Sequence, residues 1–292
     1  MTNNPISSLR NKYKQKKNLN YSDACAIMYG IIDVHQQHLE GIYTGNITVI
    51  DHYINNSHKL DTFLNKSKYI QEIIYENFIP DDVLLEIQNK QNENDKPKRI
   101  YLNRDIFDVD TIKKDIYKNG KGVNCEHIWV QSQLKKCDAD EAVSDLHHMI
   151  PANVKVNGVR SNHIFGEVDD DIAILYGNDE NNKNDKNDHD IKSEFDKKKK
   201  IFEPREISKG NIARALFYIA AIYGNKLFSN QKNIDWFEKM RPTLLEWNKI
   251  DPPDTVEIER TKLIEKIQGN VNPFIIDNSL VDKYFNSNKS YI

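Results

Sequence analysis

Residues 123–133, VNCEHIWVQSQ, place a carboxylate and an imidazole side by side at Glu126 and His127. The run is typical of a half-buried strand, in which successive side chains point to opposite faces. On a regular strand the two residues would face apart and could not act on one substrate. A shared site therefore requires the strand to bend or to end close to Glu126.

Further polar groups follow downstream. Alternation in the stretch 145–151, DLHHMIP, predicts a short second strand that its proline ends. A short helix is expected to begin near Asn153, which places Asn153, Asn157 and Arg160 on one polar face. Gly158 inside that helix costs about 1 kcal/mol relative to alanine, and we expect it to let another backbone or a ligand come close.

This set of residues suits metal-assisted hydrolysis of a phosphodiester bond. A neutral imidazole can take a proton from water, which is worth about 10² to 10⁴ in rate. Glutamate and asparagine offer oxygen ligands that suit Mg²⁺. Such a cation neutralises charge on the phosphate and contributes several kcal/mol.

The flanking segments are expected to form a helical scaffold. Apolar spacing predicts helices over 21–33, 62–78, 208–225, 235–250 and 256–270, with a break at 251–254, DPPD. In the first of these, Ser22 is the expected N-cap, and the third carries one apolar stripe. The Asn/Asp/Lys-rich segment 178–200 has almost no apolar residues, so we expect a disordered insertion. Its four lysines are more simply a solvated charge run than a phosphate contact.

Composition narrows the class of protein. The chain has 292 residues and a formal net charge of -3, so it has no global basic footprint for nucleic acid. It contains no apolar run of membrane-spanning length, and its start lacks the apolar core of a signal peptide, from which we expect an intracellular protein without membrane contact. Three cysteines, Cys25, Cys125 and Cys137, argue against a disulfide framework, and leave a Cys125–Cys137 bridge open.

Three motifs carry a resemblance to a known family. NCEHIWVQS, DLHHMIP and VNGVRSN resemble the signature of the endonuclease I family, non-specific nucleases of the ββα-metal (His-Me finger) class. The similarity extends over residues 21–277 apart from the 178–200 insertion. It implies a mixed, helix-rich α+β domain with an embedded ββα-metal motif. Residues 1–20 are then a flexible N-terminal segment, and residues 278–292 are a C-terminal tail.

The resemblance also implies roles for individual residues. His127 becomes the general base that activates water, and Glu126 and Asn157 become the protein ligands of Mg²⁺ or of another divalent cation such as Mn²⁺ or Ca²⁺. The expected substrate is DNA, with RNA as a second one, and the expected products carry 5′-phosphate ends. We expect a monomer. The supporting or substrate-binding candidates are His147, His148, Arg160, Asn162, Lys209 and Arg214.

Two departures from the family pattern stand out. Val130 occupies a position where such motifs commonly have proline. Some relatives carry an arginine between the two strands that contacts the scissile phosphate, whereas this loop offers only two lysines, which lack the bidentate fork of arginine. The substitutes that the sequence does not rank are Arg160, Arg205 and Arg214.

Two other interpretations stay open. One is a zinc-stabilised binding module with Cys125, His127, Cys137 and either His147 or His148 as ligands, although the short paired spacings of structural zinc sites are missing. The other is an inactive relative that binds nucleic acid without cutting it. A chelator separates the zinc module from the nuclease, because a structural zinc site unfolds when its metal is removed.

Overall fold

The computed structural model describes residues 5–21, 24–25, 28, 38–40, 42, 47–49, 123–176 and 192–286. This part of the chain is α+β and helix-rich with small sheets, which confirms the expected mixed, helix-rich architecture. The longer helices are α1 (Pro5–Tyr13), α10 (Glu206–Leu227), α11 (Gln231–Ile250) and α12 (Thr255–Gln268). The shorter ones are α7 (Gln131–Lys136), α8 (Asp140–Val143), α9 (Val154–Arg160), α13 (Pro273–Ile276), α14 (Ser279–Val281) and the π-helix Asp282–Asn286.

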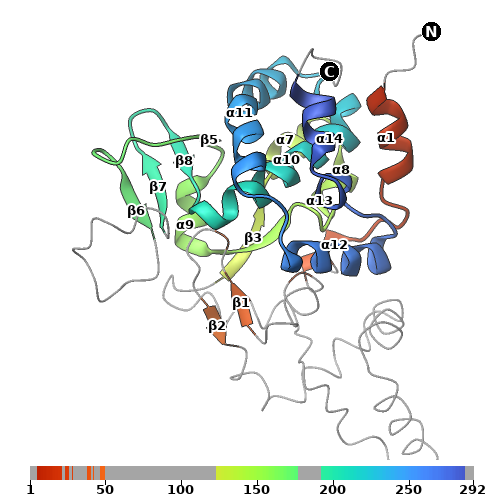
Figure 1. Ribbon diagram of the computed structural model, residues 1–292, viewed down its shortest axis with the longest axis horizontal. Helices are drawn as coiled ribbons and strands as arrows, with labels where there is room; N and C mark the ends of the chain where they lie inside the picture. The colour runs from red at the N-terminus through yellow and green to blue at the C-terminus, as the bar shows by residue number, and fades with distance from the viewer. Residues whose placement is uncertain are drawn as a thin grey trace, which may run out of the picture.

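The strands form three small sheets. Strand β1 (His38–Glu40) pairs with β2 (Ile47–Val49), and β3 (Val123–His127) pairs with β4 (Met149–Asn153), both antiparallel. The third sheet has the order β5-β8-β7-β6 and is antiparallel except for the β5–β8 pair. Its strands are β5 (Ile164–Phe165), β6 (Ile174–Tyr176), β7 (Ser193–Asp196) and β8 (Ile201–Glu203). It lies at one side of the described structure and α1 at the other, with α10 and α11 between them (Figure 1).

Helix α10 is the centre of the hydrophobic core. Its sequence predicts one apolar stripe, but the helix is buried on nearly all sides because α1, α11 and α13 pack around it. Small residues such as Ala213, Ala220 and Ala221 alternate along it with large ones such as Phe217. Helix α10 is therefore an interior helix, although it also carries buried polar side chains such as Lys209 and Arg214.

The three helices expected after residue 207 are confirmed. Helix α11 begins after Asn230, whose side chain accepts a hydrogen bond from the Lys232 amide, and α12 begins after Asp254, whose carboxylate accepts from the Glu257 amide. The proline-rich break lies between them, as expected. Of the helix expected over 21–33, only residues 21, 24, 25 and 28 are described, and the helix expected over 62–78 lies outside the described residues.

Three segments are more ordered than their polarity suggested. Residues 1–20 were expected to be flexible, yet α1 packs against α10 and buries Ile6 and Leu9. Residues 192–200 of the expected disordered insertion form β7 and a turn, in which Phe195 is buried. The expected tail begins with α14 and the π-helix, where Phe285 is fully buried and lies 4.7 Å from the Phe217 ring. In each segment a few apolar side chains reach the α10 core or the sheet, and these contacts outweigh the polar composition.

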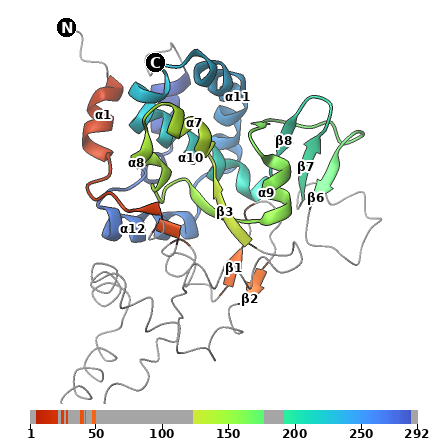
Figure 2. The ribbon, with the colours of Figure 1, turned by 180° about the vertical axis from the view of Figure 1, so that it is seen from behind.

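The β3–β4 hairpin and α9 form one compact unit. Helix α9 contacts both strands and lies between β3 and the four-stranded sheet in both ribbon views (Figures 1 and 2). Helix α9 begins near Asn153, as expected, and Asn153 is its N-cap, whose side chain accepts hydrogen bonds from the amides of Lys155 and Val156. This cap directs the chain from β4 straight into α9.

The second strand begins later than expected. The proline was expected to end it, but Pro151 is the middle residue of β4 and pairs with Cys125. The carbonyl of Pro151 accepts a hydrogen bond from the Ile42 amide, so the side of Pro151 without an N–H faces away from β3. In a two-stranded sheet both strands are edges, which is where proline is tolerated. His147 and His148 therefore precede the strand.

Two glycines inside helices give a stability test. An added Cβ at the exposed Gly158 would meet nothing within 4 Å, whereas one at Gly210 in α10 would lie 1.8 Å from the carbonyl oxygen of Asp251. In the described structure no other backbone comes close to Gly158. We expect Gly158→Ala to raise the free energy of unfolding by about 0.5–1 kcal/mol. Gly210→Ala should lower it by at least about 1–3 kcal/mol. Urea unfolding of both variants measures this, and equal effects would contradict the packing at Gly210.

Candidate active site

A pocket of about 340 Å³ opens at the end of β3, beside the start of α7 and the end of α9. It brings together five of the predicted catalytic, metal-binding and supporting residues, namely Glu126, His127, Asn157, Arg160 and Asn162. The complete lining is Cys125, Glu126, His127, Val130, Gln131, Ser132, Asn157, Arg160, Ser161 and Asn162. Strand β3, α7 and α9 thus supply one concave, polar surface.

His127 is held in one tautomer by the backbone. Its Nε2 lies 2.9 Å from the carbonyl oxygen of Val143, at the end of α8. A carbonyl only accepts hydrogen bonds, so Nε2 carries the proton in the neutral ring and Nδ1 carries the lone pair. The Tyr21 ring stacks on the imidazole at 5.7 Å, and the His148 ring meets it edge-on at 5.4 Å. The imidazole can therefore take up a proton at Nδ1 without rotating.

Burial keeps this imidazole neutral. His127 is 7% exposed, and burial, followed by the neighbouring His148, lowers its pKa from 6.5 to about 3. This buried ring is a weaker base than an imidazole with an ordinary pKa. It is fully unprotonated at neutral pH, which is the form that accepts a proton.

Glu126 and His127 share the pocket because β3 ends at His127. The pairing with β4 is regular through both residues, so the strand does not bend at Glu126 and instead ends one residue later, at His127. The chain then bends through Ile128 and Trp129 before α7 begins. The pocket lies across this end of the strand, and both side chains line it.

Asn157 enters the pocket from α9. Its Nδ2 donates to the carbonyl oxygen of Cys125 at 3.3 Å, which ties the middle of α9 to β3. The Glu126 carboxylate, 2% exposed, and the Asn157 amide are hard oxygen donors within one pocket. Carboxylate and amide oxygens together with water are the ligands that Mg²⁺ accepts. These two residues fit a hard divalent cation and are the ones that could hold it.

Arg160 occupies the base of the same site. Its Nη1 lies 2.9 Å from the Glu126 carboxylate, and both side chains are almost completely buried. The exposed Asn162 lies at the rim of the pocket, and its carbonyl accepts a hydrogen bond from the Trp236 indole. Of the supporting candidates, these two are the ones that line the pocket.

His147 and His148 lie behind the pocket. Each bonds a backbone carbonyl through Nε2, His147 to Asn270 at 3.1 Å and His148 to Ala142 at 2.6 Å. In the described part of the chain, Nδ1 of each ring is buried without a hydrogen-bond partner. A second ring proton would therefore have no acceptor, and burial lowers the pKa of each to about 4 although Asp145 opposes this.

Asp145 anchors the turn that carries these histidines. Its fully buried carboxylate accepts hydrogen bonds from the hydroxyls of Tyr218 and Tyr223 in α10 and from Gln268 at the end of α12. The carboxylate is thereby satisfied inside the core. The network attaches the loop between α8 and β4 to α10. Val143, whose carbonyl holds His127, is the last residue of α8 and directly precedes that loop.

Lys209 has a structural environment outside the pocket. Its ammonium pairs with Glu203 at 2.7 Å, with Glu167 at 3.3 Å and with Glu206. Burial disfavours the charged amine, but the hydrogen bonds to Glu203 and Glu206 outweigh it and raise its pKa. A lysine that is 3% exposed and surrounded by carboxylates is not presented to a substrate.

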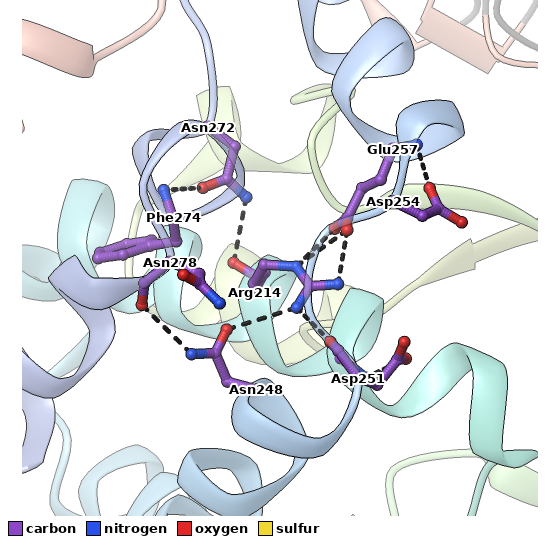
Figure 3. Close-up of polar contacts among 9 residues, drawn as sticks. Arg214, Asn248, Asp251, Asp254, Glu257, Asn272, Phe274 and Asn278 are labelled. Carbon is purple, nitrogen blue, oxygen red and sulfur yellow. Dashed lines mark hydrogen bonds and ion pairs between the residues drawn. The ribbon is translucent and has the colours of Figure 1, made fainter.

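Arg214 is likewise buried in the scaffold. It donates to the Glu257 carboxylate at 2.9 Å through Nε, and to the Asp251 carbonyl at 2.6 Å and Asn248 at 3.4 Å through Nη1 (Figure 3). It ties α10 to the ends of α11 and α12. Arg205, the other substitute considered for the phosphate contact, donates to the Ile42 carbonyl. Neither lines the pocket, so Arg160 is the one arginine of the three that does.

The zinc interpretation finds no support in the arrangement of its ligands. Among the residues that the structure describes, no three His, Cys, Asp or Glu side chains are grouped to hold a metal. Cys137 lies against Asn233 and the Leu227 carbonyl, whereas Cys125 lies beside His127. Both cysteines are free thiols, so the Cys125–Cys137 bridge is not formed.

Sequence reasoning missed three parts of the site. Tyr21 lies more than a hundred positions before His127, and nothing in the sequence pairs the two rings. The Val143 carbonyl is a backbone group without any signal in residue type. The lysine turn, Lys197–Lys200, is exposed as expected, but its position was not predicted: β5–β8 pairing of Ile164 with Ile201 brings Lys200 close to His163, next to the pocket rim. Its sequence distance from α9 hid this proximity.

Comparisons with known proteins agree with these observations. The Endonuclease I family model matches residues 7–279. The chain is 36% identical over 151 residues to Endonuclease-1 of Buchnera aphidicola subsp. Acyrthosiphon pisum (strain APS), covering 50% of this chain and 52% of that protein. It is 32% identical over 206 residues to an extracellular ribonuclease of Bacillus subtilis (strain 168), covering 65% and 64%. A periplasmic deoxyribonuclease of Aeromonas hydrophila is 31% identical over 152 residues, covering 50% and 55%.

The chain spans about half to two thirds of the length of these relatives. Their names correct one expectation. We expected an intracellular protein, but relatives named as extracellular or periplasmic nucleases point to secretion, so that expectation is wrong. Separately, no helix among the described residues has the length and apolar character to cross a membrane.

The buried histidines predict a loss of stability in acid. The pKa values of His147 and His148 are near 6.5 when unfolded and about 4 when folded, so between these values the unfolded chain binds more protons. The free energy of unfolding is therefore highest above pH 6.5. It falls as the pH is lowered, and at pH 5 the loss is about 2 kcal/mol for each histidine. Urea unfolding at pH 7.5 and 5 measures the loss. His148→Gln, which cannot titrate, should show a smaller loss, and equal losses would contradict the assignment.

Proposed function

Because the chain belongs to the endonuclease I family, we propose that it is a metal-dependent endonuclease that hydrolyses phosphodiester bonds of DNA, and also of RNA, with little sequence preference. The observation that carries the proposal is the pocket in which a neutral His127, its tautomer held by Val143, lies beside Glu126 and Asn157. Relatives named as deoxyribonucleases and ribonucleases support both substrates. In this proposal β3, β4 and α9 are the two strands and the helix of a ββα-metal element.

His127 acts as the general base. Its Nδ1 accepts a proton from a water molecule, whose oxygen attacks phosphorus in line with the leaving 3′ oxygen. The bond from phosphorus to the 3′ oxygen breaks, the 3′ oxygen takes a proton from water to become a hydroxyl, and the phosphate stays on the 5′ end. The Val143 carbonyl continues to accept the Nε2–H and stabilises the positive ring as it forms. No side chain has to move for this transfer.

Glu126 and Asn157 hold the cation that this chemistry needs. When bound, a Mg²⁺, Mn²⁺ or Ca²⁺ ion would neutralise charge on the phosphate and the leaving oxygen. Glu126 supplies a charged oxygen and Asn157 a neutral one, and the rest of the pocket leaves room for water and phosphate. Val130 and Gln131, at the start of α7, bound the pocket opposite α9.

Substrate binding explains how a buried imidazole with a low pKa can serve as the base. Burial is the main reason for that low pKa, because it disfavours the charged ring. A phosphodiester that enters the pocket brings a negative charge next to His127, and an opposite charge raises the pKa of a histidine. The proton affinity of Nδ1 therefore increases when a substrate is present.

The lysine turn extends the site along the substrate backbone. Lys197–Lys200 are all exposed, and the Lys200 ammonium lies 5.7 Å from the centre of the Phe195 ring, on which His163 also stacks. His163 follows directly on Asn162 at the pocket rim. A row of lysines beside the site attracts phosphates without reading sequence, which suits an overall acidic protein that needs a local basic surface.

Replacing the base tests the mechanism. His127→Ala should lower the rate of plasmid cleavage in Mg²⁺ by about 10² to 10⁴, because no other group at this position can take the proton. Circular dichroism shows whether the variant is folded. The control is Lys262→Ala, an exposed residue of α12 outside the pocket lining, which should stay within a few-fold of the wild type. Robust cleavage by His127→Ala would rule out the base assignment.

Chelation separates the nuclease from the zinc module. In excess EDTA the wild type should stop cutting yet keep its circular dichroism spectrum and its urea midpoint, because the cation serves the reaction and not the fold. Added Mg²⁺ or Mn²⁺ should restore cleavage. Unfolding in EDTA would favour a structural metal, and continued cleavage would exclude a cation from the reaction.

The lysine turn predicts a change in salt dependence. The triple variant Lys197→Gln, Lys198→Gln and Lys199→Gln keeps Lys200, whose backbone has a positive φ of 60°. In a His127→Ala background, its slope of log affinity for duplex DNA against log salt should fall by about 0.9 for each phosphate that the turn no longer neutralises. Fluorescence anisotropy measures the slope. The same substitutions at Lys249, Lys262 and Lys266, exposed lysines of α11 and α12, change the net charge equally. Equal slopes in the two triple variants would contradict a local role for the turn.

A further inference from the structure

Arg160 bonds three consecutive residues at the end of β3. From the last turn of α9, its Nη1 reaches the Glu126 carboxylate at 2.9 Å and the His127 carbonyl at 3.4 Å, and its Nη2 reaches the Ile128 carbonyl at 2.5 Å. Nη1 also donates to the Ser161 carbonyl at 3.1 Å. The guanidinium thus spans the turn where the strand stops and the chain bends.

The guanidinium is enclosed by the protein. Arg160 is 1% exposed, and its central carbon lies 4.5 Å from the centre of the Phe165 ring. Both terminal nitrogens are engaged by Glu126 and by backbone carbonyls. An arginine that binds a scissile phosphate must present at least one such nitrogen to the substrate. Arg160 lines the pocket but is turned toward its base.

We propose that Arg160 is a positioning residue, which aims the Glu126 carboxylate into the pocket and fixes the strand end that carries His127. This inference rests on the proposed function, in which Glu126 holds the cation. Arg160 acts through Glu126 and through the two carbonyls, and it does not touch the substrate. It thereby keeps Glu126 and His127 at one bend of the chain, whereas a regular strand would point their side chains apart.

Charge and shape both require arginine here. A buried carboxylate needs a counter-ion to stay ionised, and Arg160 is the cation paired with Glu126. Its planar fork supplies donors in several fixed directions, whereas a lysine ammonium is a single point of charge. A lysine at this position could neutralise Glu126 but could not also hold the carbonyls of His127 and Ile128. Charge compensation and positioning can therefore be separated by substitution.

The affinity for a cation in the absence of DNA provides the readout. Residues that orient a metal ligand typically change metal affinity by about 10–100-fold when they are replaced. We expect Arg160→Lys and Arg160→Met each to weaken Mn²⁺ binding by about that factor, measured by isothermal titration calorimetry. Arg160→Lys should recover most of the stability that Arg160→Met loses, yet it should not recover Mn²⁺ affinity. If Arg160 only stabilised the fold, Arg160→Lys would recover stability and Mn²⁺ affinity together.

A second buried arginine offers a matched control. Arg214 also forms a buried ion pair with a glutamate and also bonds a backbone carbonyl, but it lies in the scaffold between α10, α11 and α12 (Figure 3). Arg214→Met should destabilise the protein while Mn²⁺ affinity of the folded protein stays within twofold of the wild type. Urea unfolding identifies any variant that is partly unfolded, and trimethylamine N-oxide restores the folded state for its titration.

The outcomes separate this inference from the proposed function. Unchanged or tighter Mn²⁺ binding by Arg160→Lys and Arg160→Met would overturn the positioning role. A loss of metal-free DNA binding with unchanged Mn²⁺ affinity would assign Arg160 to the phosphate and would overturn it too. If the wild type neither binds Mn²⁺ nor cleaves DNA, the proposed function itself fails. If the wild type does both and His127→Ala is inactive, only the result for Arg160 decides the inference.

Discussion

The buried ion pair between Arg160 and Glu126 joins α9 to the last residues of β3, and the candidate site depends on that junction. Along a strand, neighbouring side chains face apart, so a carboxylate next to an imidazole gives no site by itself. Both reach one pocket because the strand ends at His127 and the chain turns. Carbonyls freed at such an end need donors, and Arg160 supplies them for His127 and Ile128. One side chain thus satisfies the backbone and the carboxylate together.

The rest of the fold holds this junction in place from behind. Asp145 connects the loop before β4 to Tyr218 and Tyr223 of α10, and α8 in that region presents the Val143 carbonyl to His127. Because α10 is buried on nearly all sides, its polar side chains have fixed partners. The orientation of the imidazole is therefore set by hydrogen bonds that extend into the core. Helix α10 contributes no lining residue to the pocket and still determines its geometry.

Local patterns predicted the parts of this structure that depend on nearby residues. Helix periodicity and caps gave α9, α10, α11 and α12, and the adjacent Glu126 and His127 indicated the site. Properties that depend on distant contacts were not predictable. Lys209 and Arg214 are basic residues on a helix, and nothing local shows that Glu203 and Glu257 neutralise them inside the protein.

Distant contacts also explain why the N-terminal segment is more ordered than its polar composition predicted. A few apolar residues such as Leu9 bury themselves on α10 and order α1, although the segment is mostly polar. Pro151 was predicted to end a strand because the rule for proline assumes that both sides of the strand are paired. Only the tertiary structure shows that one side of β4 faces Ile42 and not β3.

The site also contains buried polar groups that lower the stability of the fold, and contacts elsewhere must compensate for them. His127, His147 and His148 are buried as neutral rings, and Glu126 and Arg160 are buried as ions. Burying an ion pair is rarely favourable compared with burying apolar groups of the same size. Proteins retain such groups where their geometry is needed, and strain or unfavourable burial collects at functional sites. In this chain one buried ion pair lies at the end of β3 and another joins Arg214 to Glu257 in the scaffold, while the apolar side chains of α10 and α11 provide the compensating hydrophobic contacts. The two pairs differ in their surroundings, because Glu126 and Arg160 line the pocket together with His127, whereas Arg214 does not line it.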